Sequence, residues 1–288
     1  MTYSRRKELL VSVVSYVSAL SLVQLTLTAV DVYSWSNHAF LFISSIISLL
    51  PVIIAVALFR DHPKVAVCAS GLGVCSALAI SMSTCNSDVP FQPFGWYLLI
   101  MSLFHWSEYV VTALTSPRTL CIDSFLLNHS KEYWIAAVCS WSEFLLELYL
   151  APRTKTFRLV TALGLLFCAV GELLRKAAMF TAGANFTHII SVNKRSDHLL
   201  ITGGIYSLFR HPSYVGWFWW CIGTQLILCN PVCTIAYAVV TWRFFKERIY
   251  EEELLLINFF GVDYLQYKNR VPTGLPFIDG FRPDFGFS

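Results

Sequence analysis

Long apolar blocks alternate with short polar segments along most of this chain. Three blocks contain no charged residue: Leu9–Val30, Ala39–Phe59 and Val65–Ser87. Three further blocks of similar length contain only a few charged residues: Phe94–Thr115, Tyr133–Ala151 and Phe157–Phe180. A helix needs about 20 mostly apolar residues to cross about 30 Å of hydrocarbon. The pattern therefore predicts six membrane-spanning helices before residue 181.

The pattern changes after residue 180. A polar stretch at 181–210 cannot span a membrane, and Pro212–Trp242 then runs for 31 residues without a charge. One helix of that length would measure about 46 Å, which is too long for a single crossing. Because Asn230-Pro231 lies in its middle and is a strong turn signal, we expect a hairpin of two short spanning helices. A charged helix at 245–260 is expected to continue from the second one.

These elements predict an all-α integral membrane protein with eight transmembrane helices. Residues 1–93 would hold the first three spans. Residues 94–288 would form the functional core, with a cytosolic linker at 181–210, a C-terminal helix and tail at 245–288, and a cofactor pocket at the cytosolic face.

Composition and charge agree with a membrane protein. The chain is 56% hydrophobic and 14% charged, whereas soluble domains are about 25% charged. The nine cysteines are scattered and form no CxxC pair, so we expect neither a disulfide framework nor a metal site. A net charge of +3 is too small to indicate nucleic acid as a partner.

The distribution of basic residues predicts the orientation. If the amino terminus is cytosolic, eight spans place all but three of the lysines and arginines on the cytosolic side, as the positive-inside rule favours. Both termini would then be cytosolic. The three exceptions, Arg153, Lys155 and Arg158, lie in one loop.

A first polar cluster occupies 198–216. Its Gly203-Gly204 pair permits a sharp turn or a close approach to a ligand. Pro212 suits the first turn of a helix. Arg210, His211 and Ser213 would therefore lie at a helix mouth, where free backbone N–H groups favour an anion. An interfacial loop with no ligand is an equal alternative.

A second cluster occupies 243–253. Arg248 and Glu252 are four residues apart and share a helical face. Ordinary ion pairs at a solvated helix end would explain this equally well. The aromatic segment 259–267 follows and could fold back as a cap.

The two clusters together resemble a known family. Arg210-His-Pro-Ser-Tyr-Val-Gly216 resembles the RHPxYxG motif of small membrane methyltransferases. Arg248-x-x-x-Glu252, followed by Phe260-Gly and Tyr264-x-x-Tyr267, resembles their second motif. Three upstream segments are similar to those of eukaryotic isoprenylcysteine carboxyl methyltransferases: 104–109, 127–130 and 171–183. The resemblance covers about 94–280.

This resemblance implies methyl transfer from S-adenosylmethionine, which leaves as S-adenosylhomocysteine. The acceptor would be the α-carboxylate of farnesyl- or geranylgeranylcysteine on processed CaaX proteins, such as Ras- and Rho-type GTPases and lamins, in the endoplasmic reticulum membrane. The implied cofactor contacts are His198, Leu199, Leu200, Ile201, Tyr206, His211, Pro212, Ser213, Tyr214 and Glu252. Arg248 would be the catalytic residue that binds the substrate carboxylate, because a guanidinium can grip a carboxylate with two hydrogen bonds.

Several alternatives stay open. A phospholipid N-methyltransferase would share the cofactor, and a sterol reductase-like enzyme would use NADPH in a related C-terminal fold. A transporter would explain the spans but neither polar cluster. The sequence also leaves open whether Glu251 or Glu252 makes the main cofactor contact.

Overall fold

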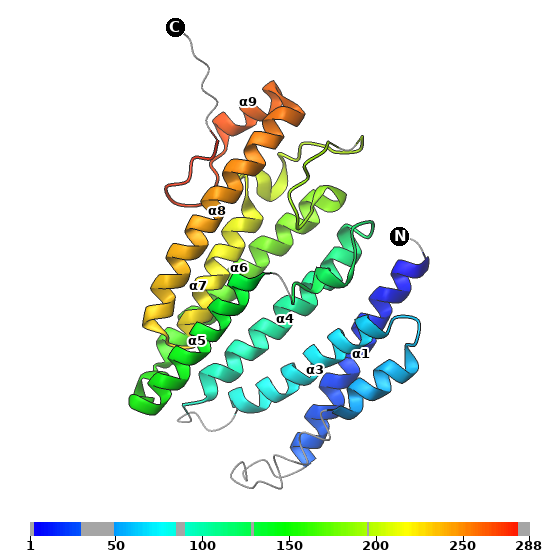
Figure 1. The fold of residues 1–288 in the computed structure, drawn as a ribbon, viewed down its shortest axis with the longest axis vertical. Helices are drawn as coiled ribbons and strands as arrows, with labels where there is room; N and C mark the ends of the chain where they lie inside the picture. The colour runs from blue at the N-terminus through cyan, green and yellow to red at the C-terminus, as the bar shows by residue number, and fades with distance from the viewer. Residues whose placement is uncertain (1–2, 30–48, 85–89, 128–129, 195, 282–288) are drawn as a thin grey trace. The chain divides into compact units, whose positions relative to one another are not determined.

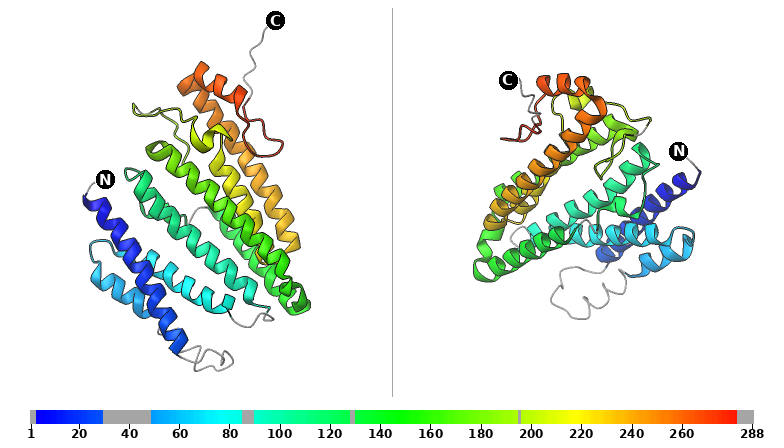
Figure 2. Two further views of the ribbon diagram at one scale, coloured as in Figure 1. Left: turned by 180° about the vertical axis from the view of Figure 1, so that it is seen from behind. Right: turned by 45° about the horizontal axis from the view of Figure 1, so that its top comes forward.

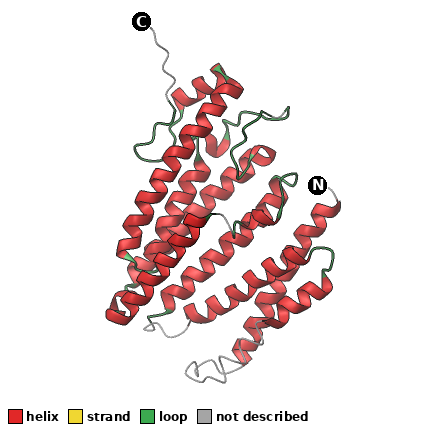
Figure 3. Ribbon diagram, in the orientation of Figure 1, coloured by secondary structure: helices red, strands yellow, loops and turns green. Residues whose placement is uncertain are grey.

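The computed structural model describes residues 3–29, 49–84, 90–127, 130–194 and 196–281, and within these ranges the chain forms helices, turns and loops but no strand (Figures 1 and 3). The chain divides into two compact units. The first comprises residues 1–162 with 227–229, and the second comprises 163–226 with 230–288. The boundary falls inside one helix, α6. The predicted division at residue 93 stays a prediction.

The first unit is built from apolar helices and two short 3₁₀ turns. Its elements are α1 (Tyr3–Ala29), a helix at Leu49–Leu58, α3 (Pro63–Thr84), α4 (Gln92–Thr115), η2 (Ile122–Phe125), α5 (Lys131–Leu150) and η3 (Pro152–Thr156). Helix α6 (Arg158–Ala182) leads into the second unit. The elements that follow are η4 (Gly183–Asn185), η5 (Gly204–Ser207), α7 (Pro212–Ile227), α8 (Pro231–Phe260) and α9 (Val262–Arg270).

Among the described residues, three helices are long and apolar enough to cross a membrane. They are Tyr3–Thr28, Pro63–Thr84 and Gln92–Thr115. The predicted span at 39–59 lies partly outside the described residues, and its described end forms the shorter apolar helix Leu49–Leu58. Helix α7 has 16 residues and is about 24 Å long, which is less than one full crossing. The total of eight spans stays a prediction.

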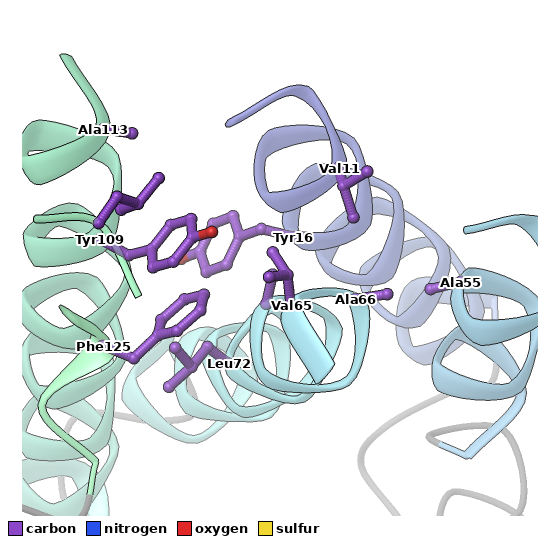
Figure 4. Close-up of a cluster of buried hydrophobic side chains, with 11 residues drawn as sticks. Val11, Tyr16, Ala55, Val65, Ala66, Leu72, Tyr109, Ala113 and Phe125 are labelled. Carbon is purple, nitrogen blue, oxygen red and sulfur yellow. The ribbon is translucent and has the colours of Figure 1, made fainter. Parts of the chain in front are cut away.

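Aromatic stacking organises the core of the first unit (Figure 4). The rings of Tyr16 and Trp106 stack at 4.1 Å, as do those of Tyr109 and Phe125. Helices α1 and α3 pack closely at Gly73, where a Cβ would lie 3.1 Å from that of Ala19. In a membrane, such small-residue contacts and dispersion replace the hydrophobic effect between helices.

A buried lysine secures the turn after α7 within the first unit. Lys155 is 1% exposed. Its Nζ donates to Glu147 Oε2 at 2.5 Å and to the carbonyl oxygens of Leu228 and Cys229 at 3.0 Å each. One of the three exceptions to the positive-inside rule is therefore a buried cation paired with an acid, and it does not count against that rule.

Glycines allow α6 and α7 to pack closely in the second unit, where both run alongside α8 in all views (Figure 2). A Cβ on Gly171 would lie 2.9 Å from Trp220 N, and one on Gly223 would lie 2.8 Å from Gly164 O. On its other face α7 packs against α8 and the tail through an apolar cluster. Its buried members are Val215, Phe218, Ile222, Phe245, Ile249, Leu275 and Ile278.

The predicted turn at Asn230-Pro231 is confirmed, since α7 ends at Ile227 and α8 begins at Pro231. Helix α8 then runs for 30 residues, about 45 Å, without interruption. The apolar segment and the charged segment after residue 245 are thus one rigid element. Beyond Phe260 the chain folds back through α9, as the aromatic segment predicts, and the Tyr267 hydroxyl donates to Tyr206 O at 2.6 Å.

Candidate active site

One tyrosine hydroxyl links the two motifs of the second unit. Arg248 Nε donates to Tyr214 Oη at 2.9 Å, and that hydroxyl donates to Glu252 Oε2 at 2.5 Å. The expectation that Arg248 and Glu252 share a face of α8 is confirmed, with Tyr214 from α7 between them. The ring of Tyr214 stacks on His211 at 5.5 Å and on Phe245 at 5.0 Å. Arg248 also donates from Nη2 to His188 O at 2.7 Å.

Glu253, the next residue along α8, is fully buried in a separate network. Its Oε1 accepts from Arg210 Nε at 2.8 Å and lies 3.3 Å from His211 Nε2. Its Oε2 accepts from Lys268 Nζ and from the Phe281 backbone N–H, the latter at 3.0 Å. Burial raises the pKa of Glu253. Hydrogen bonds and charges from His211, Lys268 and Arg210 outweigh that effect and lower the pKa to about 2.

The same network fixes the tail beside the start of α7. Arg210 N donates to Pro272 O at 2.8 Å, and Arg210 Nη2 donates to Asp279 O at 3.0 Å. Gly280 has φ +79, and a Cβ there would collide with the Glu253 carboxylate. The sequence left two alternatives open at the mouth of this helix, an anionic ligand or an interfacial loop without one. In the structure, Arg210 binds a carboxylate of the chain itself.

The three consecutive acids have different surroundings. Glu252 contacts Tyr214, whereas Glu253 is buried and Glu251 is exposed on another face of α8. The Glu252 side chain retains 30% exposure and its Oε2 lies 3.8 Å from His211 Nδ1. Glu252 is therefore the acid positioned beside both predicted motifs.

Only some of the expected cofactor contacts gather at this point. Tyr206 lies on η5, His211 directly precedes α7, and Ser213 and Tyr214 lie in the first turn of α7, which Pro212 begins. The pKa of Tyr206 is raised by burial and then by the nearby Glu252 charge.

The segment 198–201 lies farther along α8. The His198 ring packs at 5.3 Å from that of Phe260, and Leu199 N donates to Asn185 Oδ1 at 2.9 Å. Leu199 is exposed, whereas Leu200 and Ile201 are half-buried. Phe260 lies eight residues beyond Glu252, or about 12 Å along the axis.

A second guanidinium beside the site, that of Arg175 on α6, was missed by sequence reasoning. Arg175 is 2% exposed, and its Nη1 donates to Ser213 Oγ at 2.7 Å. Its Cζ lies 4.6 Å from the centre of the Trp217 ring. The sequence signal that could have found Arg175 is its spacing from Gly171. The two residues are four apart, so they share the face of α6 that contacts α7.

Comparisons with known proteins agree with these motifs. A family model described as the isoprenylcysteine carboxyl methyltransferase family matches residues 162–258, almost all of which belong to the second unit. A protein-S-isoprenylcysteine O-methyltransferase from Xenopus laevis is 54% identical over 76% of this chain and 75% of its own length. The chain belongs to the isoprenylcysteine carboxyl methyltransferase family. It is therefore a methyltransferase.

Further relatives extend the similarity. The Homo sapiens protein-S-isoprenylcysteine O-methyltransferase is 56% identical over 69% of this chain and 70% of its own. A solved structure of a eukaryotic intramembrane Ras methyltransferase, an isoprenylcysteine carboxyl methyltransferase, has a TM-score of 0.89 and 39% identity. That match covers 96% of this chain and 99% of the other. The likeness thus includes the first three helices, which the sequence resemblance did not reach.

Proposed function

We propose that this chain transfers a methyl group from S-adenosylmethionine to the α-carboxylate of a C-terminal farnesyl- or geranylgeranylcysteine. The observation that carries the proposal is the line Arg248–Tyr214–Glu252, in which a guanidinium and a partly exposed carboxylate lie on either side of one hydroxyl. Membership of the family supports this function over the reductase and transporter alternatives.

The donor set beside Glu252 fits a sulfonium cofactor. The partly exposed carboxylate of Glu252 presents negative charge, which attracts a cation. When bound, S-adenosylmethionine supplies an electrophilic methyl group and leaves as S-adenosylhomocysteine. The proposed contacts are His198, Leu199, Leu200, Ile201, Tyr206, His211, Pro212, Ser213, Tyr214 and Glu252.

Arg248 is proposed to hold the acceptor carboxylate. A terminal carboxylate has a pKa of about 3.5 and is ionised at neutral pH, so the reaction needs no general base. It needs the carboxylate oxygen aligned with the methyl carbon, and such positioning can lower the barrier by several kcal/mol. The contacts of Arg248 with Tyr214 and His188 fix its guanidinium, which has five N–H donors in total.

The apolar helices suit a prenylated acceptor. Exposed leucines, valines and isoleucines continue along helices that fall outside the three clear spans, such as Leu163, Leu166 and Val170 on α6 and Val232 and Ile235 on α8. A prenyl chain gains about 0.8 kcal/mol for each CH₂ buried in lipid. Family membership and the distribution of basic residues support the proposal that the protein lies in the endoplasmic reticulum membrane with both termini cytosolic. Its acceptors there would be Ras- and Rho-type GTPases and lamins.

The test is transfer of radiolabelled methyl to N-acetyl farnesylcysteine in membranes. Arg248→Ala should lower kcat/KM by about 10²-fold, mainly through the acceptor KM, because charge-assisted hydrogen bonds are lost. Glu252→Ala should act mainly on the KM for S-adenosylmethionine. Arg60→Ala, an exposed arginine of the first unit, is the matched control. Base-labile label identifies a carboxyl ester, whereas base-stable label on lipid would support the phospholipid N-methyltransferase instead.

A further inference from the structure

A groove lies on the face of α8 opposite the candidate active site. It has a volume of about 740 Å³ and is walled by α8 and the tail segment 277–280. Along a helix successive residues turn by about 100°, so Arg243, Lys246 and Tyr250 face away from Arg248 and Glu252. Trp242 Nε1 donates to Pro276 O at 2.7 Å and holds the tail in place as the second wall. The groove is thus a separate surface with a fixed shape.

Charges follow an order along this groove. The basic pair, Arg243 and Lys246, comes first along α8, and Glu251 follows about 7 Å beyond Lys246. Glu247 and Asp279 add two more acids to the lining. Glu247 accepts from Arg243 Nε at 3.3 Å and offsets part of the basic charge, whereas Glu251 lies beyond this pair. Acids outnumber bases, so a purely anionic ligand would meet repulsion. A ligand with a negative group followed by a positive group matches the order.

Three aromatic side chains also line the groove. Trp242 lies at the basic end, where Lys246 Nζ is 5.2 Å from the centre of its ring. Tyr250, which precedes Glu251, and Phe277 of the tail are the other two, and such rings bind quaternary ammonium groups through their π-faces. Phe277 is 93% exposed and has φ +60, a backbone conformation that bulky side chains rarely adopt. The tail therefore holds a large apolar ring outward at the rim of the groove.

The groove continues an exposed apolar row on α8. Val232, Ile235 and Val239 are each at least 60% exposed, and their spacing of three or four residues leads directly to Arg243 and Lys246. Apolar residues followed by Trp, Tyr, Lys and Arg are typical of a helix that leaves the hydrocarbon through the headgroup layer. An acyl chain along this row would bring its headgroup to the basic end of the groove.

We propose that this groove binds the headgroup of phosphatidylcholine. Arg243 and Lys246 contact the phosphate, Glu251, Tyr250 and Phe277 receive the choline ammonium, and the acyl chains lie along Val232–Val239. The charge order, the aromatic rim and the apolar row each match one part of this lipid.

The proposal can be tested on the full-length protein by native mass spectrometry after delipidation and titration with phosphatidylcholine or phosphatidylglycerol. The wild type should bind one phosphatidylcholine more tightly than phosphatidylglycerol. The double variant Arg243→Ala/Lys246→Ala should bind phosphatidylcholine about tenfold or more weakly than the wild type, since two charge-assisted contacts are lost. Glu251→Gln should reduce the preference for phosphatidylcholine.

Arg270→Ala, an exposed basic residue outside the groove, is the matched control and should bind like the wild type. Tighter binding of phosphatidylglycerol, or unchanged binding by the double variant, would overturn the proposal. Glycerophosphocholine, which lacks acyl chains, should not compete at equal concentration. Equal competition would assign the groove to a soluble phosphodiester instead of a membrane lipid.

Discussion

Replacing Glu253 by glutamine removes one negative charge and keeps the shape of the side chain. Glu253 has an ordinary pKa of 4.5 that falls to about 2 in the folded protein. Each pKa unit corresponds to about 1.4 kcal/mol, so the ionised carboxylate contributes about 3 kcal/mol of stability at neutral pH. The variant leaves Arg210 and Lys268 facing a neutral amide. A loss of about 3 kcal/mol agrees with the usual cost of breaking a buried ion pair.

The sign of the pH dependence follows from the lowered pKa. The contribution of Glu253 is fully present above pH 4.5 and is lost by about 1.4 kcal/mol per pH unit as the pH falls toward 2. At pH 7 the variant should melt about 6–12 °C below the wild type. At pH 3.5 the gap should shrink by roughly one third to one half, because the wild type has begun to lose the same charge.

The assay is thermal unfolding of the full chain in detergent, followed at both pH values. Glu251→Gln is the matched control, because it makes the same change at an exposed position two residues before Glu253 on α8. Its melting temperature should stay within about 1 °C of that of the wild type. Equal melting temperatures of Glu253→Gln and the wild type at pH 7 would refute the reasoning. A difference in melting temperature that stays constant down to pH 3.5 would show that Glu253 does not act through its charge.

Three further substitutions test other parts of the structure. Tyr214→Phe removes the hydroxyl that joins Arg248 to the acid on α8, so kcat/KM for methyl transfer should fall by about tenfold with folding retained; full activity would show that the bridge is dispensable. Lys155→Met leaves Glu147 and two carbonyls without their buried partner and should cost about 2–4 kcal/mol, measured as a lower Tm; an unchanged Tm would contradict this role. Gly216→Ala should lower the Tm and the yield of folded protein, because its Cβ would lie 2.8 Å from a backbone nitrogen on α6, and a tolerant site would mean that the helices can separate.

Hydropathy predicted much of the fold because the length of an apolar block can be read directly from consecutive residues. Of the three uncharged blocks before residue 90, Leu9–Val30 and Val65–Ser87 fall largely on α1 and α3, and Ala39–Phe59 lies partly outside the described residues. The turn at Asn230-Pro231 is where the sequence predicted it. The packing of the helices against one another could not be predicted in the same way. Gly171 and Gly216 come from segments 45 residues apart, and only the folded chain shows that their backbones touch.

The candidate site was predictable to the extent that it is local. Arg248 and Glu252 share a face because of their spacing, and Tyr214 joins them because the hairpin returns α8 beside α7. Arg210 was harder to interpret. The sequence offered an anionic ligand near it as one of two equal alternatives, but its partner, Glu253, lies 43 residues away and is one of three adjacent acids. Nothing in their spacing says which acid turns inward.

The three acids show how one helix carries separate tasks. Because each residue turns by about 100°, Glu251, Glu252 and Glu253 face the groove, the Tyr214 hydroxyl and the buried tail network in succession. Helix α8 is uninterrupted from its apolar half to these acids, so a shift of the helix moves all three surfaces together. A lipid bound in the groove would press on the same rigid element that positions Arg248. If the groove is occupied as we propose, the double variant at Arg243 and Lys246 should therefore change the acceptor KM as well as lipid binding, although neither residue lies beside Tyr214.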